Sequence, residues 1–190
     1  MATAEQQLTQ LKQAELLVQQ DSSHYPTILP AVLALSAQRD ITLRRWIANF
    51  LTNTFASKQL ESQLKEDLAT LSLDPLRTLI EGDDDLVLKN CILCSSLIYP
   101  ILFRRMYFLP FFFLFFFISI PGNILTEFWC RCKNTSEGSL WGRLTLLKGK
   151  ILRIWDGSVN EGVRIAGAKF ITKVVATQTP GIKDPRVLSV

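Results

Sequence analysis

The best candidate metal ligands in this chain are its four cysteines. They form two pairs, Cys91-x-x-Cys94 and Cys130-x-Cys132, and four thiolates can hold a zinc ion. The second pair is spaced more tightly than zinc ligands usually are, and the first lies in an apolar stretch, where a thiol behaves as a small hydrophobic side chain. A redox Cys-x-x-Cys would also need a preceding strand. We therefore expect core thiols, no metal and no cofactor.

Acid–base chemistry has few candidate residues. The chain has a single histidine, His24, in a Ser-Ser-His-Tyr-Pro turn, where a packed or capped loop residue is more usual than a catalytic base. The acidic triplet Asp83 to Asp85 lacks the further carboxylates of a calcium loop, and it suits the positive end of a helix dipole. The nine glycines are scattered, without a phosphate-binding loop. We therefore expect no catalytic residues and no enzyme activity.

Chain length favours one domain, and the N-terminal sequence favours a reducing compartment. The 190 residues carry a formal net charge of +4, spread along the chain without a block of like charges. This distribution argues against a dedicated nucleic-acid-binding arm. The first residues lack the basic and apolar regions of a signal peptide, so disulfides are not expected.

Apolar residues recur with the period of an α-helix along most of the chain, and no segment alternates for long as a strand would. We predict an all-α fold of antiparallel helix pairs, although periodicity alone does not separate a HEAT-like α-solenoid from a closed bundle. Expected N-caps are Asp40, Asn160 and either Ser136 or Ser139. The predicted helices cover residues 5–20, 27–36, 41–57, 60–71, a short piece from Asp74-Pro75 to near Gly82, 86–103, 140–155 and 162–177.

An aromatic run interrupts this pattern. Met106 to Ile120 reads MYFLPFFFLFFFISI, with Pro110 within it and Pro121 just after it. Three interpretations remain open: a translated intron, because these residue types have pyrimidine-rich codons; a transmembrane segment over 106–122, just long enough for the ~30 Å hydrocarbon core; or a soluble insert. We expect the run to lower solubility. The predicted domains are therefore helical repeats over 1–103, an insert over 104–131, and further repeats over 132–190.

Several blocks together resemble the N-terminal domain of the symplekin family, the scaffold of the nuclear machinery that cleaves and polyadenylates pre-mRNA. They are SSHYPTILPAVL (Ser22 to Leu33), RRWIANFLTNTF (Arg44 to Phe55), LVLKNCILCSSLIYPILF (Leu86 to Phe103), KGKILRIWD (Lys148 to Asp156) and GVRIAGAKFITKVVATQTPG (Gly162 to Gly181). The resemblance covers nearly everything except residues 104–131. Family members continue through more helical repeats, so we expect a solenoid truncated at Val190.

The resemblance implies a HEAT-repeat domain, nuclear localisation and a non-catalytic scaffold role in mRNA 3′-end formation. It implies two kinds of partner: protein subunits of the cleavage and polyadenylation complex, and a phosphatase of the RNA polymerase II C-terminal domain. An RNA contact is a further option, without direct base readout. The alternative function is a small single-span membrane-anchored protein with a helical soluble domain.

One set of surface residues is the candidate partner-binding site. Arg164, Lys169 and Lys173 form a loose basic stripe on the last predicted helix, opposite an expected apolar face of Ile165, Phe170 and Val174. The stripe is interpreted either as a solvated helix face or as a surface for an acidic partner or RNA.

Overall fold

The computed structural model describes residues 4–58, 60–116 and 139–178, and in these residues every regular element is helical. The all-α prediction is therefore confirmed. The elements, in chain order, are α1 (Ala4–Gln20), the 3-10 turn η1 (Ser22–His24), α2 (Tyr25–Ala34), the 3-10 turn η2 (Leu35–Ala37), α3 (Ile41–Ala56), α4 (Ser62–Leu79), α5 (Asp85–Phe116), α7 (Leu140–Gly157) and α8 (Glu161–Gln178).

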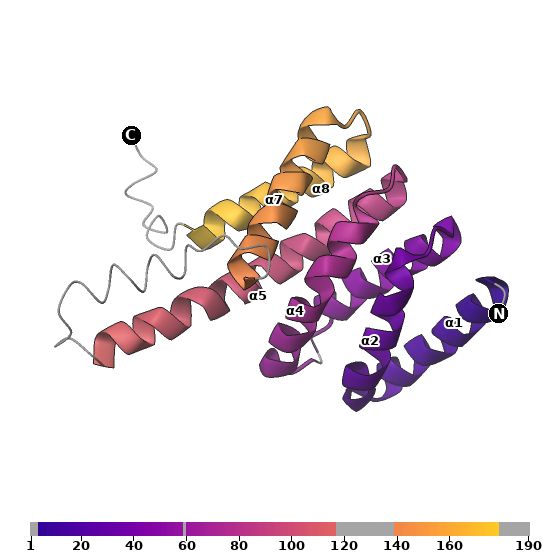
Figure 1. The fold of residues 1–190 in the computed structure, drawn as a ribbon, viewed down its shortest axis with the longest axis horizontal. Helices are drawn as coiled ribbons and strands as arrows, with labels where there is room; N and C mark the ends of the chain where they lie inside the picture. Colours follow the sequence, from indigo (N-terminus) through magenta and orange to yellow (C-terminus); the bar gives the residue numbers. More distant parts are fainter. Residues whose placement is uncertain (1–3, 59, 117–138, 179–190) are drawn as a thin grey trace.

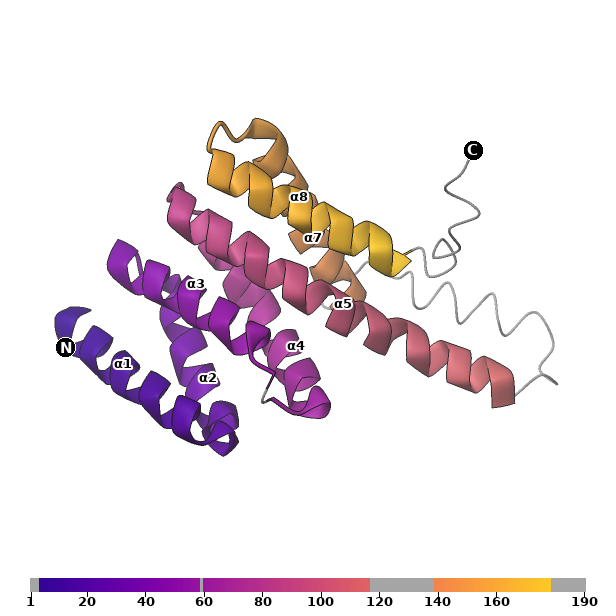
Figure 2. The same cartoon turned by 180° about the vertical axis from the view of Figure 1, so that it is seen from behind.

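The helices form two layers. Helices α1, α3, α5 and α8 lie side by side in one layer, and α2, α4 and α7 form the other (Figures 1 and 2). Each layer grows in one direction along the chain, because α5 packs between α3 and α8 while α4 packs between α2 and α7. This is the solenoid-like stacking of helix pairs that the sequence predicted, and it is distinct from a closed bundle.

Helix α5 forms the centre of the hydrophobic core. Its buried side chains include Ile92, Ile98 and Leu102, all fully inaccessible to solvent. Within the described residues one stretch, Asp85–Arg104, is apolar and long enough to cross a membrane, and 61% of its most apolar window is buried inside the protein. A helix packed between two neighbours must be apolar on most of its circumference. Its hydrophobicity is therefore explained by its central place in the solenoid.

Local capping chemistry sets four helix starts. The sequence predicted the caps Asp40 and Asn160, as well as Ser139 as one of two candidates, and all three are confirmed. In the acidic triplet, Asp84 is the residue that caps α5. Each side-chain oxygen accepts a hydrogen bond from a backbone N–H in the first turn: Leu43 N to Asp40 at 2.8 Å, Val87 N to Asp84 at 3.0 Å, Gly142 N to Ser139 at 3.0 Å and Val163 N to Asn160 at 3.2 Å.

The predicted break at Asp74-Pro75 was wrong, because α4 continues through Pro75 to Leu79. A proline inside a helix removes one backbone hydrogen bond and costs ~3 kcal/mol. Tertiary packing offsets this cost: Leu73 and Leu76, on either side of the proline, are both buried in the core. From α7, Arg143 donates hydrogen bonds to the Thr70 carbonyl and to the Asp74 carboxylate, both at 3.1 Å.

Helix α5 is also longer than predicted. It reaches Phe116 and does not stop near Phe103, so Pro110 does not interrupt the helical backbone. Apart from Pro110, the sequence between Phe103 and Phe116 has no local signal that would end a helix, because it contains no glycine and no short polar residue to compete for backbone hydrogen bonds. Residues 117–138, with Pro121, Cys130 and Cys132, lie outside the described residues. The boundaries of the aromatic insert remain a prediction.

Candidate partner-binding surface

Helix α8 carries the candidate residues and is held by one buried face. Val163, Ala166, Phe170 and Val174 are buried, at the spacing of one side of a helix. Phe170 meets Tyr99 of α5 edge to face, with ring centroids 5.8 Å apart and planes at 82°. These contacts fix the rotation of α8 about its axis and therefore decide which side chains face solvent.

Helix α7 approaches α8 closely at Gly167. A β-carbon built on Gly167 would lie 2.2 Å from Trp155 Cδ1 and 2.9 Å from Trp155 Cβ. No side chain fits at such distances, so the absence of a β-carbon allows the indole of α7 to lie against the α8 backbone. The two helices consequently form a tight antiparallel hairpin that presents the outer side of α8 to solvent.

The three predicted basic residues are all exposed on α8. In the part of the chain that the structure describes, no hydrogen bond or ion pair engages the side chains of Arg164, Lys169 or Lys173. Their expected exposure is confirmed. Whether they bind a partner stays a prediction.

The expected placement of Ile165 was wrong. It is 49% exposed and does not share the buried face with Phe170 and Val174. With 3.6 residues per turn, Arg164 and Lys169 are about 140° apart around the helix, and Ile165 falls between them. The basic residues therefore do not make one stripe. They border an exposed strip that contains Ile165, with Arg164 on one side and the Lys169–Lys173 pair on the other.

The sequence contained a signal for this arrangement. Val163, Ala166, Phe170 and Val174 recur at intervals of three or four residues, which defines the buried side without Ile165. An isoleucine outside that periodicity is an exposed apolar residue flanked by cations. We define the α8 surface as Arg164, Ile165, Lys169 and Lys173.

Other basic residues have structural roles in the solenoid. Two of them tie neighbouring helix pairs together as ion pairs: Arg143 with Asp74 at 2.8 Å and Lys150 with Glu81 at 2.5 Å. Arg44 donates to the Thr78 and Leu79 carbonyls at 3.1 and 2.8 Å, and so satisfies the C-terminal end of α4. This separation of bonded from unbonded cations could not be read from the even distribution of charge along the sequence.

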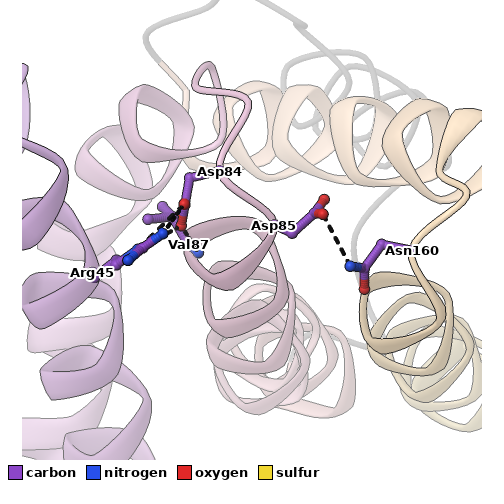
Figure 3. Close-up of polar contacts among 5 residues, drawn as sticks. All are labelled: Arg45, Asp84, Asp85, Val87 and Asn160. Atoms are coloured by element: carbon purple, nitrogen blue, oxygen red, sulfur yellow. Dashed lines mark hydrogen bonds and ion pairs between the residues drawn. The ribbon is translucent and has the colours of Figure 1, made fainter.

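The acidic triplet is part of the same framework. Arg45 of α3 bonds Asp84 through two nitrogens, with a shortest contact of 2.6 Å, while Asp84 also caps α5 (Figure 3). The hydrogen bond from Arg45 is the main reason that the pKa of Asp84 lies below its usual value. On the other side, Asn160 donates to Asp85 at 2.9 Å and links the start of α8 to α5 (Figure 3). Asp84 and Asp85 thus join three helices of one layer, α3, α5 and α8, at their N-terminal ends.

Among the described residues, those with potential for catalysis do not form a site. Cys91 and Cys94 are fully buried, as predicted for core thiols, and burial raises the pKa of Cys91 to about 12. Such thiols are poor nucleophiles because they stay protonated. His24 lies on the surface, 3.9 Å from Asp21. Across residues 4–58, 60–116 and 139–178, no three His, Cys, Asp or Glu side chains gather as a metal site requires.

Two comparisons with known proteins identify relatives. A model of the symplekin/Pta1 N-terminal family matches residues 84–189, more than half of the chain. The mRNA cleavage and polyadenylation specificity factor complex subunit pta1 of Schizosaccharomyces pombe is 33% identical over 189 residues. That match covers 100% of this chain and 24% of the relative, so the chain spans about a quarter of the relative's length. No solved structure matches the chain.

The family match begins at Asp84, the cap of α5, and extends through both helices of the α7–α8 hairpin. It therefore includes the α8 surface and the contacts that fix its orientation. The match to the Schizosaccharomyces pombe protein also covers the helices before α5. On these matches, the chain belongs to the symplekin/Pta1 N-terminal family.

Proposed function

We propose that this chain is a non-catalytic scaffold segment of the machinery that cleaves and polyadenylates mRNA in the nucleus. The observation that carries the proposal is the match along the whole chain to a subunit of a cleavage and polyadenylation specificity factor complex. The fold supports it physically, because stacked helix pairs offer extended surfaces for other proteins.

The partners we propose are protein subunits of the cleavage and polyadenylation complex and, from the family resemblance, a phosphatase of the RNA polymerase II C-terminal domain. The α8 surface is the proposed contact. An exposed apolar side chain, Ile165, bordered by three unbonded cations suits an acidic protein surface that contributes an apolar side chain to the contact. RNA would engage the cations through its phosphates, without a use for Ile165.

Charge reversal on α8 tests this proposal. The variant Arg164→Glu/Lys173→Glu is used as bait for 3′-end processing factors and the polymerase phosphatase from nuclear extract. The matched control is Arg39→Glu/Arg153→Glu, which changes the net charge equally at two exposed residues outside α8. Because exposed charges contribute less than ~1 kcal/mol each to folding, both variants should keep the wild-type circular dichroism spectrum and melting temperature.

We expect the α8 variant to capture less of the processing factors, with the loss greatest at low salt because long-range attraction is screened at high salt. The control variant should capture as much as the wild type. Equal capture by a well-folded α8 variant would place the contact elsewhere on the solenoid. If the unmutated chain captures none of these factors, the scaffold role itself is contradicted.

A further inference from the structure

A cavity of ≈ 290 Å³ opens between α1 and α3, far along the solenoid from α8. It lies beside the C-terminal halves of both helices, and Tyr25 at the start of α2 closes one side. The volume is at the lower end of the range for small-molecule pockets, so it suits one large side chain better than a whole cofactor. Neither the family match, which begins at Asp84, nor the α8 surface includes this cavity.

The floor of the cavity is apolar and well fixed. Val18, Tyr25 and Phe50 are all buried in the core. The rings of Tyr25 and Phe50 have centroids 6.4 Å apart, and Phe50 stacks on Trp46 at 5.0 Å with planes 12° from parallel. Because these side chains are almost wholly buried, a group that enters the cavity would touch only the small part of each that stays open, but that part is held in a fixed position.

The rim of the cavity is polar and carries a single charge. Glu15, Gln19 and Asn53 lie there, and Glu15 is the one ionisable acid among lining residues that include no basic side chain. No hydrogen bond or ion pair engages these three side chains among the residues that the structure describes. On a chain whose net charge is +4, an unbonded carboxylate beside an open cavity favours a cationic occupant.

The helix ends strengthen this preference. The cavity is bordered by the last turns of α1 and α3, and a helix C-terminus carries partial negative charge that attracts cations. The chain itself provides an example at the same place, because the Lys65 ammonium donates to the carbonyl of Ser57, directly after α3. That ammonium compensates the end of α3, so Glu15 and the end of α1 remain to attract a second cation.

We propose that this cavity is a docking site for a basic segment of a partner protein, which inserts one arginine side chain. The alkyl stem would pack against the open edges of Val18 and Tyr25, and the guanidinium N–H groups would donate to the Glu15 carboxylate. A phosphate or another anionic ligand would instead be repelled by Glu15 and by the end of α1. The site is independent of the α8 surface and adds a second contact to the scaffold.

The test is an NMR titration of the ¹⁵N-labelled full chain with N-acetyl-arginine N′-methylamide. The neutral control ligand is the citrulline analogue, which has the same shape without the charge. We expect saturable shifts of the backbone amides of Gln19 and Thr54, with citrulline binding at least fivefold more weakly. Glu15→Gln should weaken arginine binding about fivefold, as expected for a partly exposed ion pair of about 1 kcal/mol. Glu5→Gln, on the exposed side of the same helix, should leave it unchanged.

Equal binding of arginine and citrulline, no saturable shift, or shifts confined to residues away from the cavity would overturn the proposal. So would unchanged arginine affinity in Glu15→Gln. The comparison of the two ligands on the unmutated chain does not depend on how well any variant folds. The charge-reversed α8 variant should bind the arginine probe normally, so the outcome here is separate from that of the scaffold proposal.

Discussion

The close contact between Gly167 and Trp155 makes a specific prediction about stability. Gly167→Ala places a methyl group where Trp155 Cδ1, Cγ and Cβ lie 2.2, 2.6 and 2.9 Å away. The atoms at risk include the root of the indole side chain, so a change of its outer torsion cannot relieve the overlap. Helix α7 or α8 has to shift, and the packing around Phe170 shifts with it.

The expected change in the free energy of unfolding follows from two opposing effects. Overpacking of a well-packed contact costs about 1–3 kcal/mol, and the short distances here place the cost near the upper end. Replacing glycine by alanine inside a helix stabilises the folded state by about 1 kcal/mol through helix propensity. We therefore expect Gly167→Ala to lower the free energy of unfolding by about 2 kcal/mol, which corresponds to a fall of roughly 4–8 °C in melting temperature for a domain of this size.

Gly149 provides a matched control in α7. A β-carbon there has no atom within 4 Å, so Gly149→Ala should stabilise the protein by up to about 1 kcal/mol through helix propensity alone. Urea denaturation followed by circular dichroism at a helix band measures both variants. A double-mutant cycle with Trp155→Ala isolates the contact, because the alanine at 167 should cost little once the indole is gone. If Gly167→Ala is as stabilising as Gly149→Ala, the inferred close packing of α7 and α8 is refuted.

Two further predictions concern ionisable groups. Asp84→Ala removes both the cap of α5 and the bond to Arg45 and should lower stability by about 1–2 kcal/mol at neutral pH, whereas Asp84→Asn, which can still cap, should cost less. Folding lowers the pKa of Asp84, so its charge stabilises the folded protein at pH values above the pKa of this group in the unfolded chain. This stabilisation is lost as the pH falls through the folded-state pKa. If denaturation curves at lower pH still showed wild type to be more stable than Asp84→Asn, this reasoning would be contradicted. Cys91 and Cys94 should react with iodoacetamide at mildly alkaline pH only after unfolding, because burial raises the pKa of both thiols, that of Cys91 to about 12. Peptide mapping by mass spectrometry follows each cysteine separately, and rapid labelling of the native chain at Cys91 would show that α5 is not the core helix described here.

Local chemistry explains how much of the fold could be predicted from the sequence. The starts of α3, α7 and α8 follow from Asp40, Ser139 and Asn160, each of which bonds a backbone N–H three residues ahead. The burial of Cys91 followed in the same way from its place in an apolar helical stretch. These features depend on residues within about one helical turn, so the sequence contains all the information they need.

The candidate site was only partly predictable. The exposure of Arg164, Lys169 and Lys173 followed from the sequence, but the expected position of Ile165 was wrong because the buried side of α8 was misplaced. The cavity beside Glu15 had no local signal, since its lining residues come from three helices separated by turns. Its existence depends on the distance and angle at which α1 and α3 pack.

The sequence by itself therefore determined that the chain is helical, where most helices begin and which residues have the chemistry for a core. Tertiary structure alone decided that α4 continues through Pro75 and which cations are free to meet a partner. Arg45 bonds Asp84, which lies 39 residues away in the sequence, and Arg143 bonds Asp74, which lies 69 residues away. Such pairs form only when the packing of helix on helix brings distant segments together, and that packing depends on buried surfaces from the whole chain.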